Sequence, residues 1–158
     1  MKKVLLTLII GCCFALTSEA QTRLGAGLAW GSDVDDLGLG INGEFFVKDN
    51  ISINPGLILY FEDNGRYDDR DWWEINVNGN FYFATEGSVD FYGVGGINLT
   101  TRSIKSGGER DGDTELGVNL GIGANFNTNG SILPYTQFKY IAGNYDQAVL
   151  FFGIKFPI

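Results

Sequence analysis

The chain has 158 residues, a length that suits one domain, and its formal net charge of −8 argues against a nucleic-acid partner, because phosphates require a basic surface. It contains no histidine, which excludes Ser-His-Asp and Cys-His catalytic sites and His-ligated zinc. No run of 18 or more apolar residues is long enough to form a membrane-spanning helix. We therefore expect a protein that is not an enzyme and that carries no cofactor.

The first 20 residues, "MKKVLLTLIIGCCFALTSEA", combine two lysines, an apolar run and small residues at the positions of a cleavage site. This pattern predicts a secretory signal peptide that is removed after Ala20, leaving residues 21–158 as the single domain. "LIIGC", ending at Cys12, also fits a bacterial lipoprotein signal. Both cysteines lie in this segment, so the mature chain needs neither a disulfide nor a thiolate metal site.

From Gln21 onward, apolar and polar residues alternate, and no helical period of useful length is present. The alternation predicts eight strands at 22–30, 37–47, 51–61, 72–83, 88–100, 114–126, 131–142 and 147–157. Each is about as long as a tilted strand that crosses a bilayer. Pro55 and Pro134 fall inside strands, where a proline lacks the N–H for the ladder, so we expect bulges or strand starts at these positions.

The connections between these strands alternate in length. The tight ones are 48–50, 84–87 and 127–130, and the longer or more polar ones are 31–36, 62–71, 102–113 and 143–146. All long connections therefore fall at one end of a meander and all tight turns at the other. This arrangement predicts an all-β fold, an eight-stranded antiparallel up-and-down barrel with both termini at the tight-turn end.

Each strand has one apolar face, and the opposite face is rich in Asn and Gly with few charges. The water-facing surface of a soluble barrel would be rich in Lys and Glu, whereas small residues suit the narrow lumen of eight strands. We therefore predict that the apolar face contacts lipid. The inverted arrangement, a soluble lipid-binding barrel, is the alternative.

Aromatic residues gather near both ends of the apolar face, as expected where a barrel meets the two bilayer interfaces. The predicted girdle residues are Trp30, Phe61, Trp73 and Tyr140 toward the long loops, and Phe45, Phe81, Phe83, Phe91, Phe126 and Phe156 toward the tight turns.

Three inward charges lie near the tight-turn end of adjacent strands, because the first and last strands meet when the barrel closes. Arg23, Glu44 and Lys155 are predicted to form a buried ion cluster, since an unpaired charge in the lumen would be costly.

A second set of inward charges lies nearer the long loops. Lys139 is predicted to pair with Glu115 and, as a further partner, with Glu74. Both clusters, with small apolar plugs at Phe46, Ile58, Leu133, Ile141 and Phe151, imply a filled interior. The alternative is a narrow channel, in which the same polar residues line a pore.

The long loops are acidic, and "DGDTE" at 111–115 contains part of a calcium-loop pattern without its full ligand spacing. The candidates for contact with a divalent cation are Asp33, Asp35, Asp36, Asp111 and Asp113. Such a cation would bridge the loops to lipopolysaccharide phosphates, which the loop arginines would also touch.

The last strand, "AVLFFGIKFPI", places Leu150, Phe152, Ile154 and Phe156 on the apolar face before the chain ends in Pro157-Ile158. In its eight alternating strands and in the pattern of this last strand, the chain resembles the small eight-stranded outer-membrane barrels of Gram-negative bacteria, the OmpA-barrel, OmpX and OmpW-like group. The resemblance covers residues 22–157.

That resemblance implies an outer-membrane protein with both mature termini in the periplasm. Its expected partners are outer-membrane lipid, lipopolysaccharide and, through the last strand, the barrel-assembly machinery, and we expect a monomer. The expected role is structural, or one of surface interaction through four long acidic loops. A porin-like channel for small or apolar solutes is the alternative.

Overall fold

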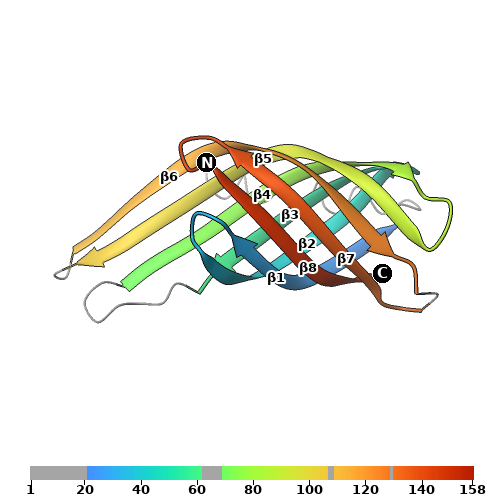
Figure 1. Cartoon of the computed structure of the whole chain (residues 1–158), viewed down its shortest axis with the longest axis horizontal. Coiled ribbons are helices and arrows are strands. Elements are labelled where there is room, and N and C mark those ends of the chain that lie inside the picture. Colours follow the sequence, from blue (N-terminus) through green and yellow to red (C-terminus); the bar gives the residue numbers. More distant parts are fainter. Residues whose placement is uncertain (1–20, 62–68, 107–108, 129) are drawn as a thin grey trace, which may run out of the picture.

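Eight β-strands form one closed sheet in the computed structural model, which describes residues 21–61, 69–106, 109–128 and 130–158 (Figure 1). The strands are β1 (Thr22–Gly31), β2 (Asp36–Lys48), β3 (Ile51–Tyr60), β4 (Asp69–Ala84), β5 (Val89–Ser106), β6 (Glu109–Phe126), β7 (Leu133–Ala142) and β8 (Gln147–Pro157). All neighbours are antiparallel in the order β1 to β8, which confirms the predicted up-and-down barrel. The described residues contain no helix that is long and apolar enough to cross a membrane. The predicted signal peptide lies outside them.

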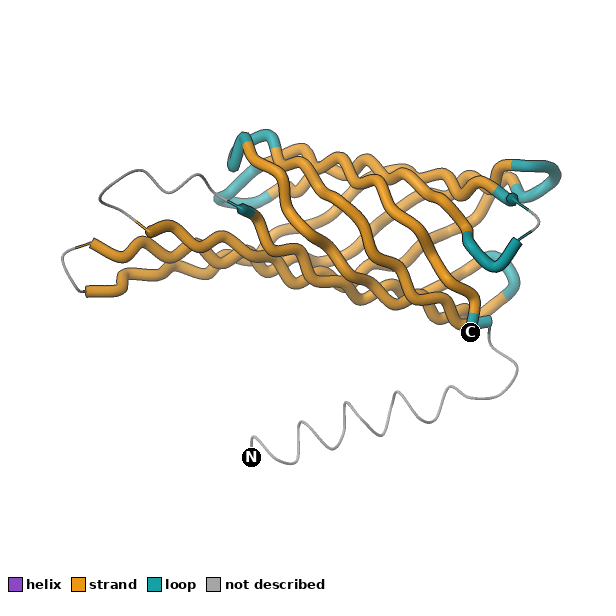
Figure 2. The backbone as a smooth tube through the Cα atoms, turned by 90° about the horizontal axis from the view of Figure 1, so that it is seen from below, coloured by secondary structure: helices purple, strands orange, loops and turns teal. Residues whose placement is uncertain are grey.

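Pairing of the first and last strands closes the barrel. Leu24 lies opposite Phe156 in this ladder, and the backbone N–H of Ile158 donates to the Thr22 carbonyl oxygen at 2.8 Å. Figure 2 shows the C-terminus at one end of the barrel and the longest strands projecting from the other. Closure gives every strand a paired neighbour on both sides within the barrel, so the barrel has no open sheet edge that faces the hydrocarbon.

The two faces are oriented as the alternation predicts. Leu116 is 63% exposed and Leu120 61% exposed on the outside, whereas Glu44 and Glu74 are fully buried inside. An apolar exterior around buried charges is the reverse of a soluble lipid-binding barrel, so that alternative is wrong.

Strands β5 and β6 are longer than the sequence predicts. Their ladder continues through Arg102 opposite Asp113 to Ser106 opposite Glu109, and β4 begins at Asp69 (Figures 1 and 2). The prediction of a loop over 102–113 is therefore wrong. The segment is polar because it lies beyond the apolar belt, but backbone hydrogen bonds between paired strands do not require an apolar face.

Pro55 interrupts the β2–β3 ladder without a bulge. The pairs Asn42 with Gly56 and Phe45 with Ile53 keep one register on either side of it, and the side-chain amide of Asn54 donates to the Gly43 carbonyl oxygen at 3.0 Å. This side chain replaces the donor that a proline lacks. The prediction of a bulge at Pro55 is thus wrong.

The register shifts lie elsewhere, beside two of the tight turns. One falls between Phe46 and Lys48 and the other between Tyr82 and Ala84. Pro134 is the second residue of β7, which confirms a strand start there.

Large rings inside the barrel lie against glycines on nearby strands. A Cβ added at Gly40 would lie 2.3 Å from the Phe151 ring, and one at Gly123 would lie 2.2 Å from the Tyr92 ring. The Phe151 ring also stacks on Tyr135, with centroids 5.4 Å apart. The inward glycines therefore provide the space that these aromatic side chains occupy.

Gly40→Leu is expected to lower the free energy of unfolding by about 1–3 kcal/mol, because the new side chain must displace the packed Phe151 ring. Urea titration in lipid vesicles, followed by tryptophan fluorescence, measures this change. Gly93→Leu is the matched control, since an added Cβ at Gly93 meets nothing within 4 Å. Equal stability of the two variants would contradict the packing role of Gly40.

Candidate functional site

The first cluster in the lumen joins three strands near the tight-turn end. The Lys155 ammonium on β8 donates to Glu44 Oε2 on β2 at 2.9 Å, and Arg23 Nη1 on β1 lies 3.6 Å from the same oxygen. Glu44 and Lys155 are almost completely buried, and the Arg23 side chain is 14% exposed. The structure thus brings together the three residues that the sequence grouped.

Neutral groups complete the shell of Glu44. Its Oε1 accepts hydrogen bonds from the Tyr82 hydroxyl at 2.6 Å, Ser52 Oγ at 2.8 Å and Asn80 Nδ2 at 3.0 Å. Asn125 Oδ1 accepts from Lys155 at 3.1 Å. A buried ion pair is tolerated when its remaining hydrogen-bonding capacity is satisfied in this way.

The second cluster surrounds Glu74 on β4, nearer the long loops. Lys139 on β7 donates to Glu74 Oε2 at 3.3 Å, and the Tyr60 hydroxyl donates to Oε1 at 3.1 Å. Gln147 also donates to Oε1.

The predicted pairing of Lys139 with Glu115 is wrong, whereas its pairing with Glu74 is present. Glu115 Oε2 instead accepts from Asn144 Nδ2 at 2.7 Å, outside the lumen. Glu115 lies too near the end of the protruding hairpin to reach β7, whose ladder with β6 ends at Val118 opposite Ala142.

Asparagine side chains connect the charges near the middle of the barrel. Asn76 Oδ1 accepts from Lys139 at 2.6 Å, from Asn119 at 2.8 Å and from Asn98 at 3.0 Å, while Asn119 also donates to Asn78 Oδ1 at 2.7 Å. One amide group can accept and donate at once, so this network satisfies many buried polar atoms with short side chains.

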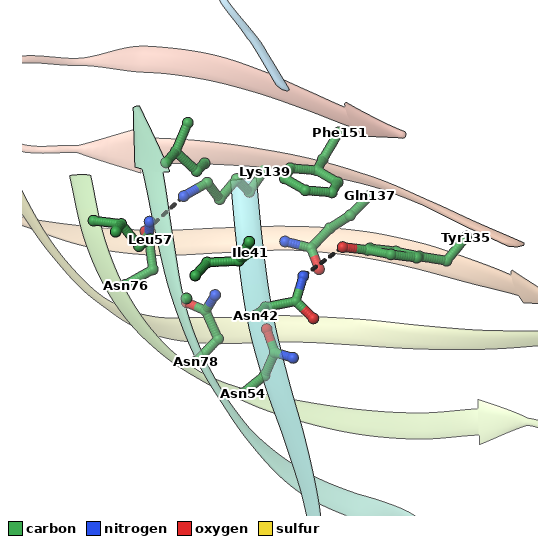
Figure 3. A pocket seen from close by; sticks show the side chains of 12 residues that line it. Ile41, Asn42, Asn54, Leu57, Asn76, Asn78, Tyr135, Gln137, Lys139 and Phe151 are labelled. Atoms are coloured by element: carbon green, nitrogen blue, oxygen red, sulfur yellow. Dashed lines mark hydrogen bonds between the residues drawn. The ribbon is translucent and has the colours of Figure 1, made fainter. Parts of the chain in front are cut away.

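A cavity of about 30 Å³ lies beside this network. Figure 3 shows Asn42, Asn54 and Asn78 on one side of it and Gln137 and Tyr135 on the other. This volume holds about two water molecules, since one water needs roughly 10–15 Å³.

Apolar and aromatic side chains also lie inside the barrel. Ile58, Leu133, Ile141 and Phe151 are buried, and Phe46 packs against the buried cluster of Tyr82, Tyr92 and Val94. The same alternation places further buried residues inside the barrel. They are Ala29, Tyr60, Trp72, Tyr82, Tyr92, Val94, Tyr135 and Val149.

At the long-loop end, Arg102 joins elements that are distant in sequence. Its guanidinium carbon lies 3.5 Å from the centroid of the Trp72 ring and 4.3 Å from that of the Tyr145 ring, and Nη2 lies 2.5 Å from Asp33 Oδ2. The Tyr145 hydroxyl donates to Asp113 Oδ2 at 3.1 Å. Partial desolvation and this carboxylate raise the pKa of Tyr145 above its ordinary value. Sequence reasoning missed this site, because it assigned Arg102 to a loop.

The five candidate aspartates do not make a metal site in the described part of the chain. No group of three or more potential ligands is found there, Asp33 is paired with Arg102, and the Asp111 side chain lies outside the described residues. Asp113 accepts from Tyr145 and from the Thr114 backbone N–H at 2.9 Å. Asp35 is in the left-handed region, with φ of 55°, in the β1–β2 turn, and Asp36 begins β2.

The ten predicted girdle residues lie on the outer face. Trp73 and Phe45 are half-buried by their neighbours, and the others are exposed. Their place at an interface with lipid head groups stays a prediction.

A closed antiparallel barrel with an apolar exterior and an ion-paired polar interior defines a transmembrane β-barrel. The chain belongs to the outer membrane protein β-barrel domain family, whose model matches residues 4–151. This family is that of bacterial outer-membrane barrels. No curated protein is similar enough in sequence to count as a match.

Solved structures share the fold at low sequence identity. The N-terminal β-barrel domain of OprF from Pseudomonas aeruginosa is 11% identical, with a TM-score of 0.73 over 87% of this chain and 97% of that one. Neisserial surface protein A is 16% identical, with a TM-score of 0.68 over 89% and 98%. Ail, the attachment invasion locus protein of Yersinia pestis, is 13% identical, with a TM-score of 0.66 over 88% and 97%.

Proposed function

We propose that this protein is a monomeric, non-catalytic outer-membrane barrel that acts through contacts at the cell surface rather than by transport. The observation that carries the proposal is the sheet of β4, β5 and β6, which projects beyond the other strands (Figure 2). The β5–β6 ladder extends to Ser106 opposite Glu109, whereas the β6–β7 ladder ends at Val118. A protruding strand edge of this kind can contact a partner directly.

The chemistry of the loop end favours a positively charged partner. Asp113, Glu115 and Asp146 lie there, whereas Arg102 and Asp33 form an ion pair that neutralises both charges. The name of the similar Ail protein refers to attachment and invasion, which agrees in kind with a role in contact. Contact of the loops with lipopolysaccharide is part of the same proposal.

The orientation and assembly of the barrel complete the proposal. The tight turns and both mature termini would face the periplasm, since short turns lie on that side of outer-membrane barrels. A secretory signal peptide would direct export from the cytoplasm. The assembly machinery would recognise β8, whose outward residues Phe152 and Ile154 are exposed.

Attachment of bacteria that display the protein tests this function. Displaying cells are expected to bind a polylysine-coated surface several-fold better than vector-only cells, to lose the difference in high salt, and to show no gain on polyglutamate, since screening weakens exposed charge contacts. The matched variant carries Asp113→Asn and Glu115→Gln, which removes two carboxylates from the protruding strand β6 and retains Arg102 and Asp33. Reduced attachment by this variant supports the sheet as the contact surface. Unchanged attachment would contradict it.

A narrow channel is the second candidate, and the continuous polar network around Asn76 favours it. Against a channel, the side chains that lie in the lumen leave little space for solutes. We therefore expect no stable conductance steps in a planar bilayer. Reproducible steps from the unmodified protein would favour the channel.

A further inference from the structure

Arg102 occupies the mouth of the barrel at the long-loop end, where four separate parts of the chain meet. Trp72 comes from β4, Arg102 from β5, Asp33 from the β1–β2 connection and Tyr145 from the β7–β8 connection. We propose that these four residues form a lock, which we call the Arg102 lock, that holds both connections over the mouth and controls access of water to the lumen. This inference goes beyond the proposed contact role.

The geometry of the lock matches the chemistry of a guanidinium. Its planar, always-charged group can stack on aromatic faces while its edge binds a carboxylate, and a lysine cannot do both equally well. Here the Trp72 and Tyr145 rings, with centroids 6.4 Å apart, both contact the guanidinium, and Asp33 binds its edge. The group therefore connects two aromatic rings and one carboxylate from three other segments.

Burial beneath the lock supports this role. Trp72 is only 4% exposed, and it packs with Tyr60 in the cluster that fills this half of the lumen, against which Val34 of the β1–β2 connection also lies. The Trp72 indole N–H has no hydrogen-bond partner among the described residues. The ring is thus held by packing and by Arg102. Once Arg102 is removed, rotation of the indole toward water would satisfy its N–H.

The β1–β2 connection is also bound to the first residues of β8, directly after the β7–β8 connection. The backbone N–H of Ser32 donates to the Ala148 carbonyl oxygen at 2.9 Å, and the Ala148 N–H donates to Ser32 Oγ at 3.0 Å. The segments that the Arg102 lock would hold in place are residues 32–34 of the β1–β2 connection and residues 143–146 of the β7–β8 connection.

The test uses the refolded mature chain in lipid vesicles, in a Trp30→Phe, Trp73→Phe background that leaves Trp72 as the sole tryptophan, which is excited selectively at the red edge of its absorption. Arg102→Met is expected to raise quenching of Trp72 by acrylamide about threefold, and to speed amide hydrogen exchange at residues 32–34 and 143–146 about tenfold, because local opening sets the exchange rate. Arg102→Lys should lie between Arg102→Met and the parent, since it keeps the charge and loses the planar stack.

Lys48→Met is the matched control, because it removes one exposed positive charge at the opposite end of the barrel. Heat-modifiable migration on gels verifies that each barrel is folded. If Arg102→Met does not fold, Asp33→Asn and Tyr145→Leu are measured instead, and each should show the same changes at smaller size. Quenching and exchange equal to those of Lys48→Met would overturn the proposal. Attachment to polylysine is a separate readout, so failure of the lock and failure of the contact role are distinguishable.

Discussion

Glu44→Gln is expected to be the most destabilising single substitution in the lumen, with a loss of about 3–5 kcal/mol in the free energy of unfolding. The change leaves the Lys155 ammonium and the Arg23 guanidinium without the carboxylate that they share. Lys155 is 1% exposed and therefore has no access to bulk water in the folded barrel. Urea titration in lipid vesicles measures the loss.

Two comparisons isolate the charge as the cause. Glu86→Gln makes the same chemical change in an exposed turn and should alter stability by less than about 0.5 kcal/mol. Adding Lys155→Met to Glu44→Gln should recover more than half of the loss, because the isolated buried ammonium is then removed. A double variant that is less stable than Glu44→Gln alone would show that the cost arises from packing rather than from the unpaired charge.

Leu120→Arg is expected to lower the free energy of unfolding by about 2–4 kcal/mol in lipid vesicles, because it places a charge near the midplane of the bilayer. Leu120 is 61% exposed and lies on β6 about halfway between Leu116 and Phe126, within the outward apolar residues. The same titration, performed in vesicles, measures the loss.

Thr114→Arg provides the control on the same strand. Thr114 is exposed and lies opposite Thr101, where the outer face has already become polar, so the cost there should be about 0–1 kcal/mol. Equal stability of the Leu120→Arg and Thr114→Arg variants would argue that the apolar surface does not lie in hydrocarbon.

Alternation with a period of two predicts the strands and their faces, because successive side chains on a strand point to opposite sides. The same rule places Glu44, Arg23 and Lys155 at one level of adjacent strands once the barrel closes. Closure itself follows from the apolar outer face, since an open sheet edge in lipid would leave backbone groups unsatisfied. This half of the lumen could therefore be predicted from the sequence.

The loop-end half could not be predicted in the same way. The partner of Lys139 depends on how far each strand is shifted against its neighbour, and the polar residues around Glu115 give no hydrophobic pattern to fix that shift. For the same reason, the sequence did not predict that β5 and β6 extend beyond the apolar belt. It therefore did not predict that Arg102, which lies in this part of β5, points inward. Contacts such as Arg102 with Trp72 and Tyr145 join connections that no periodicity relates.

The sequence by itself determined the class of fold, the number of strands, the side of the sheet that faces lipid and the Arg23, Glu44 and Lys155 cluster. These properties depend on local alternation and on the cost of unpaired polar groups, and both can be evaluated along the chain. Only the tertiary structure decided that Glu74 is the partner of Lys139, that Asn54 replaces the missing donor at Pro55, and that Arg102 lies between two aromatic rings at the mouth. Each of these contacts depends on register and on three-dimensional proximity, which a residue's place in the sequence does not specify.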